Sequence, residues 1–159
     1  MEIDPPFKRH VLVSVRPEYA SKILDGEKTV ELRRRFPASP VIGSVILIYS
    51  SSPVSAVVGS AQIKAVRKLP VVQIWTQHGK EACISKKDFD TYFNGLRHGF
   101  AILLANAQTL KQQIGIAELQ KQFGIAPPQS YRYVHQGCIL LLSNERVQAS
   151  HRHQHRHWP

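Results

Sequence analysis

The sequence predicts an α+β fold, in which a small mixed β-barrel is surrounded by short helices. Apolar, β-branched segments of strand length alternate along the chain with short segments of helical periodicity. Most segments between the strands are too short for the crossover helices of a parallel α/β sheet, which favours a mixed barrel. The chain has 159 residues, 43% of them hydrophobic, so it suits one domain with a sizeable core.

The first predicted elements are a strand, a helix and a second strand. His10–Val15 is apolar and β-branched, as expected of a buried strand. The helix predicted over 16–26 has Pro17 at its first helical position and Gly26 as a left-handed stop. The next strand is predicted over Thr29–Arg35.

Two further strands are predicted over 44–50 and 56–69. Both segments are rich in valine, isoleucine and alanine. Gly59 lies inside the second segment and indicates a bulge or a tight bend, because glycine weakens a regular strand.

From Pro70 onward the pattern is helical over two segments. Ser85 and Asp88 have the spacing of a capping box at the start of the second. Tyr92 and Phe93 in that segment have helical spacing, which favours a place mostly in the core. The alternative is that they stack on bases, as aromatic side chains do in RNA-binding grooves. The remaining predicted elements are a strand over 99–110, a helix over 115–124, a loop over 126–134 and a closing strand over 137–143.

The folded domain is predicted over residues 10–143. Residues 1–9 form an extended lead-in, and residues 144–159 are rich in histidine and arginine without apolar periodicity, which predicts a disordered tail. No preformed metal site is expected in that tail, because a real site needs positioned supporting groups. The chain has two cysteines, no signal-peptide pattern and no apolar run long enough to span a bilayer. We therefore expect a cytoplasmic protein with no membrane association and no cofactor.

Charge is the most informative bulk property of the chain. Lysine plus arginine number 21 and aspartate plus glutamate 11, which gives a net charge of +10. A basic surface of this size favours polyanions, and nucleic acid is the commonest of them. The predicted partner is RNA or a nucleoside-like ligand, with single-stranded DNA as a second candidate. The charge carries no information on oligomeric state.

The segment GEKTVELRRRF, residues 26–36, concentrates charge in one predicted strand. Side chains alternate along a strand, so Glu31, Arg33 and Arg35 share one face while the apolar residues between them point into the core. Lys28 lies in the preceding turn, from which a long side chain can reach either face. Lysine and arginine can hold phosphate, and glutamate can accept from a base amine or act as a general base. A solvated Glu31–Arg33 pair without function has the same pattern, so both interpretations stay open.

The same stretch resembles the G-x-K-x-x-E-x-R pattern of the ASCH domain family, at Gly26, Lys28, Glu31 and Arg33. The resemblance extends over residues 10–142 and includes the apolar first strand, the short helix before the motif and the later aromatic helix. ASCH domains are similar to the PUA domain, an RNA-binding β-barrel. The resemblance implies a cleft that holds a nucleotide or nucleobase, in a translation- or transcription-linked role. Lys28 and Arg33 would contact phosphate or base, and Glu31 would brace Arg33 or accept from a base.

The resemblance also leaves a hydrolase as an alternative. Some relatives are N4-acetylcytidine amidohydrolases that use a lysine and a threonine three residues later. Lys28 matches the lysine, but Glu31 stands where the threonine would be and cannot supply a nucleophilic hydroxyl. Other relatives are ribonucleases, for which Glu31 would be the base while Lys28 or Arg33 stabilises the phosphorane. A third alternative is a sensor whose cleft holds a free nucleoside.

A second candidate contact is the YRY sequence that follows two prolines near the end of the domain. Tyr131 and Arg132 alternate an aromatic and a basic side chain, a pattern suited to base stacking combined with phosphate contact. The alternative is that the tyrosines in this predicted loop only cover the core.

Overall fold

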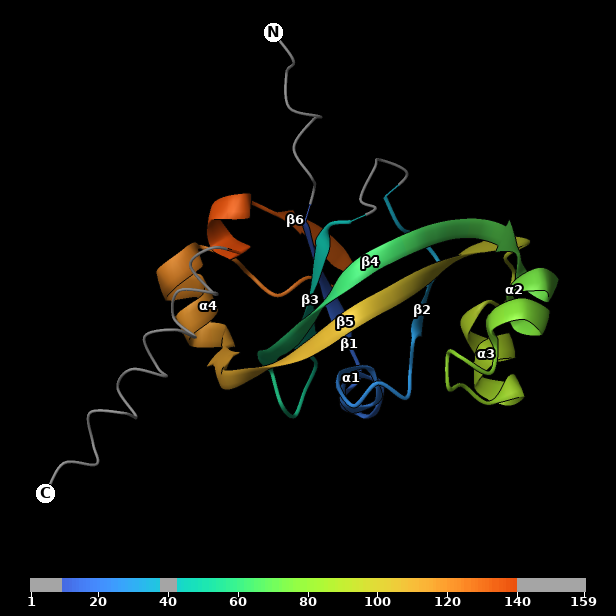
Figure 1. Ribbon diagram of the computed structural model, residues 1–159, viewed down its shortest axis with the longest axis horizontal. Coiled ribbons are helices and arrows are strands. Elements are labelled where there is room, and N and C mark those ends of the chain that lie inside the picture. Colours follow the sequence, from blue (N-terminus) through green and yellow to red (C-terminus); the bar gives the residue numbers. More distant parts are fainter. Residues whose placement is uncertain (1–9, 38–42, 140–159) are drawn as a thin grey trace, which may run out of the picture.

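The computed structural model describes residues 10–37 and 43–139 and confirms the predicted α+β fold with a mixed sheet (Figure 1). Six strands form one sheet in the order β2-β5-β4-β3-β1-β6. The predicted lead-in over 1–9 and the predicted tail over 144–159 lie outside the described residues. The elements are β1 His10–Val15, α1 Pro17–Leu24, β2 Val30–Arg33, β3 Val45–Ser50, β4 Ala56–Pro70, α2 Val71–His78, α3 Lys86–Tyr92, β5 His98–Gly115, α4 Ile116–Phe123 and β6 Tyr131–Val134.

Strand β1 is the centre of the core because both of its faces are buried. It pairs in parallel with β3 and antiparallel with β6. Val11 and Val13 pack in one cluster with Ile23 of α1, whereas Leu12 packs in another with Leu119 of α4. Because both faces are buried, the consecutive residues Val11, Leu12 and Val13 are all apolar, without the regular polar alternation of a half-exposed strand.

The two longest strands, β4 and β5, form an antiparallel ribbon with helices at both ends (Figure 1). The pair α2 and α3 lies at one end and α4 at the other. Phe89 of α3, Phe93 directly after α3 and Ile74 of α2 pack in one cluster with Val30 and Leu32 of β2. In the described part of the chain, no helix combines the length and the apolar character needed to cross a membrane.

Gly59 is the position of the predicted bulge. The register of β4 against β5 shifts between Val57 and Gly59. A Cβ atom at Gly59 would lie 2.4 Å from Cδ2 of Leu24 and 2.5 Å from the backbone oxygen of Gln108. The missing side chain therefore lets α1 and β5 approach β4 closely.

We expect Gly59→Ala to lower the free energy of unfolding by about 1–3 kcal/mol, because the backbone of β5 has to move to admit a methyl group. Chemical denaturation measures the change. Gly137→Ala is the matched control, since no atom lies closer than 3.9 Å to its added Cβ. Gly137 lies in a helical turn, where alanine is favoured over glycine. Gly137→Ala should therefore leave the free energy of unfolding unchanged or raise it by up to about 1 kcal/mol. Equal effects at both positions would contradict the close approach at β4.

Two sequence predictions near the end of the domain are wrong. Residues 131–134, placed in a loop, form the edge strand β6, where Tyr131 pairs with Val13 and Val134 with His10. Residues 137–139, placed in a closing strand, belong to a helical turn over 136–139. The last described strand, β6, therefore lies a few residues before the closing strand that the sequence predicted. The rest of that predicted strand, 140–143, lies outside the described residues.

Candidate functional site

A pocket opens where the free edge of β1 faces the free edge of β2. Strand β6 pairs with β1 only as far as Val13, whereas β3 pairs with the other edge of β1 through Val15. On the β6 side, the backbone nitrogen of Ser14 donates to the backbone oxygen of Ser130 at 3.1 Å. The pocket has a volume of about 300 Å³, at the small end of the range for ligand sites. Its lining comprises Ser14, Val15, Arg16, Tyr19, Lys28, Glu31, Leu32, Arg33, Ile84, Asp88, Thr91 and Tyr92.

Lys28 is buried in this pocket, with 4% of its surface exposed. Its Nζ donates to the backbone oxygen of Ala82 at 2.6 Å and lies 5.1 Å from the ring centre of Tyr19. Burial lowers the pKa of Lys28 from its ordinary value of 10.5, while the nearby Glu31 carboxylate acts in the opposite direction. Lys28 therefore gives up its proton more readily than an exposed lysine.

Glu31 is 7% exposed and lies on the pocket face of β2, as strand alternation predicts. Its Oε1 accepts a hydrogen bond from the backbone nitrogen of Leu32 at 2.9 Å. Its Oε2 is buried and has no hydrogen-bond partner among the described residues. Buried polar atoms normally have partners, so an unpaired carboxylate oxygen in a pocket is available to a ligand.

Arg33 connects the two edges of the pocket. Its Nη2 donates to the backbone oxygen of Ser14 at 2.6 Å, and its Nη1 donates to that of Ser130 at 3.4 Å. Between Glu31 and Arg33 no ion pair forms in the part of the chain that the structure describes. The guanidinium therefore lies beside β1 where a further strand could pair. Its buried Nε has no hydrogen-bond partner among the described residues.

We expect Arg33→Met to lower the free energy of unfolding by about 1–3 kcal/mol, because the carbonyl of Ser14 loses its donor in a partly buried site. Urea denaturation monitored by fluorescence measures this change. Arg35→Met is the control, since that side chain is exposed two residues further along, and it should change stability by less than about 0.5 kcal/mol. If both substitutions have the same small effect, Arg33 does not hold the two edges together.

Tyr92 of α3 closes the other side of the pocket. Its hydroxyl donates to the backbone oxygen of Leu32 at 3.3 Å and accepts from the backbone nitrogen of Arg34 at 3.2 Å. Burial raises the pKa of Tyr92 above its ordinary value of 10.0. Tyr92 was predicted to lie mostly in the core with Phe93. Phe93 is 2% exposed, but Tyr92 lines the pocket and protects the free edge of β2.

The other predicted site residues lie outside the pocket lining. Gly26 has a positive φ of 85° and forms the turn that precedes Lys28, as expected of a left-handed stop. Arg35 is exposed beyond the end of β2. Tyr131 packs against Phe36 at 5.7 Å between ring centres, and Arg132 donates to the backbone oxygen of Ala126. The YRY segment thus belongs to the edge strand β6, and neither Tyr131 nor Arg132 lines the pocket.

Three contributors to the site were not predicted from the sequence: Ser14, Ala82 and Tyr19. Ser14 and Ala82 act through backbone oxygens, which carry no signal in the residue type. Tyr19 lies on the short helix before the motif, and only the placement of α1 against the pocket reveals its role. Over residues 10–37 and 43–139, no group of three or more His, Cys, Asp or Glu side chains is placed to hold a metal ion.

Comparison with known proteins agrees with the fold and the motif. The ASCH domain model matches residues 13–128. A curated protein of Zymomonas mobilis, described as an ASCH domain-containing ribonuclease, is 34% identical over 132 residues, which cover 82% of this chain and 88% of the relative.

Solved structures give the same assignment. The crystal structure of ASCH from Zymomonas mobilis matches with a TM-score of 0.78 and 30% identity, covering 90% of this chain and 96% of that one. Human THYN1, solved in complex with DNA containing 5-methylcytosine, matches with a TM-score of 0.50 and 16% identity over 86% of this chain and 97% of its own, which supports the fold alone. This chain belongs to the ASCH domain family.

Proposed function

We propose that this protein is a ribonuclease that cleaves RNA in the pocket between β1 and β2. The observation that carries the proposal is the 34% identity, over 82% of the chain, to a protein described as an ASCH domain-containing ribonuclease. It favours the predicted alternative, a hydrolase acting on RNA, over the main prediction of a module that only binds RNA.

The pocket holds groups suited to cleavage by the RNA's own 2′-hydroxyl. Glu31 Oε2, which has no partner among the described residues, would take the proton as the 2′-oxygen attacks phosphorus. The Lys28 ammonium and the charge of Arg33 would stabilise the phosphorane oxygens. The bond from phosphorus to the 5′-oxygen then breaks, and Lys28, whose pKa is lowered by burial, gives that oxygen a proton. The products are a 2′,3′-cyclic phosphate and a 5′-hydroxyl.

The second hydrolase alternative, removal of acetyl from N4-acetylcytidine, has less support. Glu31 occupies the position of the nucleophilic threonine and reaches the pocket as a carboxylate. Thr91 also lines the pocket, but its hydroxyl donates to the backbone oxygen of Lys87 at 3.0 Å. A hydroxyl held in this way is poorly placed as a nucleophile.

A cleavage assay with three substrates tests the proposal. The purified chain is incubated with a short RNA, with the DNA of the same sequence and with N4-acetylcytidine. We expect cleavage of the RNA alone, with products ending in 2′,3′-cyclic phosphate, because DNA lacks the attacking hydroxyl. A single 2′-deoxy substitution at the cleaved position should block the reaction. RNA that binds but is never cut would favour the binding module, and cleavage of DNA would exclude this mechanism.

A further inference from the structure

The turn over residues 79–83 lies against the chain segment that carries Lys28. The backbone oxygen of Ala82 accepts from Lys28 Nζ at 2.6 Å. The backbone oxygen of Glu81 accepts from the backbone nitrogen of Thr29 at 3.1 Å. The turn therefore contacts both the catalytic ammonium and the entry to β2, so a shift of the turn would move both.

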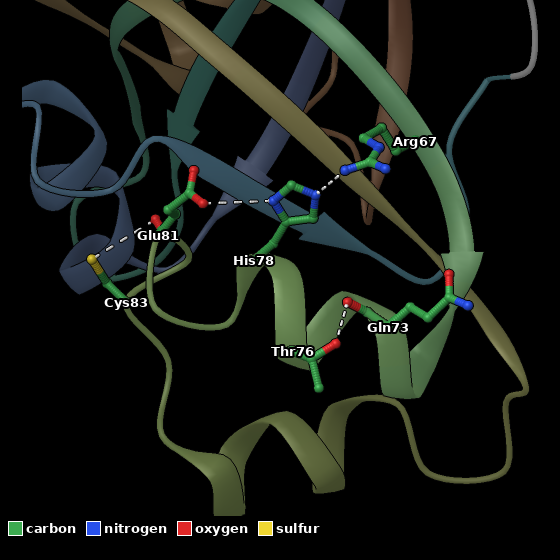
Figure 2. Close-up of polar contacts among 6 residues, drawn as sticks. All are labelled: Arg67, Gln73, Thr76, His78, Glu81 and Cys83. Atoms are coloured by element: carbon green, nitrogen blue, oxygen red, sulfur yellow. Dashed lines mark hydrogen bonds and ion pairs between the residues drawn. The ribbon is translucent and has the colours of Figure 1, made fainter.

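A buried histidine connects this turn to the sheet (Figure 2). His78, the last residue of α2, is 6% exposed and lies between Arg67 of β4 and Glu81 of the turn. Its Nε2 is 2.9 Å from Nη1 of Arg67, and its Nδ1 is 3.8 Å from Oε1 of Glu81. Arginine can only donate, so Nε2 of His78 is the acceptor in this contact. The buried Nδ1 makes no hydrogen bond among the described residues, so the firm side-chain contact of His78 is the one to Arg67.

Backbone hydrogen bonds carry this connection on to the pocket. The backbone oxygen of His78 accepts from the backbone nitrogen of Ala82 at 2.9 Å, and Ala82 is the residue whose own oxygen holds Lys28. The side chain of Cys83 donates to the backbone oxygen of Glu27 at 3.4 Å, which adds a further contact between the turn and the Lys28 segment. These contacts form a path from Arg67 on β4 through His78 and Ala82 to the Lys28 Nζ in the pocket.

We propose that Arg67 and His78 are positioning residues, which hold the Lys28 ammonium in the pocket through the turn over 79–83. The proposal rests on the ribonuclease function proposed above. Neither residue lines the pocket in the described part of the chain, so neither contacts the RNA there. Their effect is on geometry, because a displacement of about 1 Å at a catalytic group can lower the rate about 100-fold.

Three variants and one control separate this role from general stability. His78→Leu keeps an apolar volume but removes the acceptor, while His78→Gln keeps an acceptor oxygen for Arg67. Arg67→Met removes the donor from an exposed position on β4, where folding should tolerate the change. Lys64→Met is the matched control, since it removes one positive charge from an exposed position of the same strand.

The first measurement is the kinetics of RNA cleavage. We expect His78→Leu and Arg67→Met each to lower kcat about tenfold or more with KM changed less than about twofold, because the RNA-binding groups remain in place. His78→Gln should retain most of the activity, and Lys64→Met should behave as the wild type. The double variant of Arg67 and His78 should be no worse than either single variant, because both break the same path.

The second measurement does not depend on activity. Acetylation of lysines by a water-soluble reagent, followed by mass spectrometry, reports how accessible the Lys28 amine is relative to exposed Lys87 in the same sample. Lys28 should react slowly in the wild type, and several-fold faster in His78→Leu and Arg67→Met than in Lys64→Met. If the wild type cleaves no RNA, the ribonuclease proposal fails, and this measurement still decides whether the two residues hold Lys28.

Two results would overturn the positioning role. One is wild-type acetylation of Lys28 in both His78→Leu and Arg67→Met. The other is faster acetylation of Lys28 in these two variants while their kcat equals that of an active wild type. The turn would then affect the position of Lys28 but not the reaction.

Discussion

Glu31→Gln is expected to lower RNA turnover about 100-fold or more while RNA affinity changes only a few-fold. Glutamine keeps the size of glutamate and one acceptor oxygen, which can still bond the backbone nitrogen of Leu32. It cannot take a proton from the attacking 2′-hydroxyl, so the general-base contribution is lost. Single-turnover cleavage measures the rate, and binding of an RNA that is 2′-deoxy at the cleaved position measures affinity separately.

Glu27→Gln is the matched control for this substitution. Glu27 lies four residues earlier with an exposed side chain, outside the pocket lining, so its loss of charge should leave turnover unchanged. Wild-type turnover in Glu31→Gln would exclude Glu31 as the base. A large loss of affinity with unchanged turnover of bound RNA would instead assign Glu31 to recognition of a base.

Local patterns were sufficient to predict most of the fold. The glycine stop at Gly26 and the capping serine at Ser85 act through atoms only a few residues away, and the apolar, β-branched content of His10–Val15 is typical of a buried strand. Strand β6 was missed because its Tyr131–Val134 segment follows two prolines and has only one buried residue, Val134. Pairing with β1 makes it a strand, and pairing partners are set by the tertiary fold rather than by local propensity.

Of the residues predicted for the site, Lys28, Glu31 and Arg33 line the pocket, whereas Arg35, Tyr131 and Arg132 do not. Alternation along β2 was enough to place Glu31 and Arg33 on one face, and the structure places Lys28 in the same pocket. It was not enough to show that Arg33 donates to the backbone of Ser14 instead of pairing with Glu31. Partners of that kind come from distant segments through main-chain atoms, so their positions depend on how β1 and β2 are arranged in space.

Lys28→Met is expected to lower RNA turnover about 100- to 1,000-fold, because the phosphorane loses one of its proposed stabilising cations and the leaving 5′-oxygen loses its proposed proton donor. Methionine is unbranched and fills the same space without a charge. Lys87→Met on α3 is the control, since that side chain is exposed and should leave turnover unchanged. Turnover in Lys28→Met within about threefold of the wild type would remove Lys28 from the mechanism.

The same variant is expected to change how stability depends on pH. Burial lowers the pKa of Lys28 from 10.5, so between the lowered value and 10.5 the unfolded chain binds more protons than the folded one. The free energy of unfolding should therefore gain a positive contribution from Lys28 as pH rises through that interval. Lys28→Met lacks this contribution, so the stability of the wild type minus that of the variant should increase with pH on the alkaline side. Lys87→Met serves again as the control. Urea denaturation at a series of pH values measures the difference, and a difference that stays flat or falls with rising pH would show that Lys28 is not held as a destabilised ammonium.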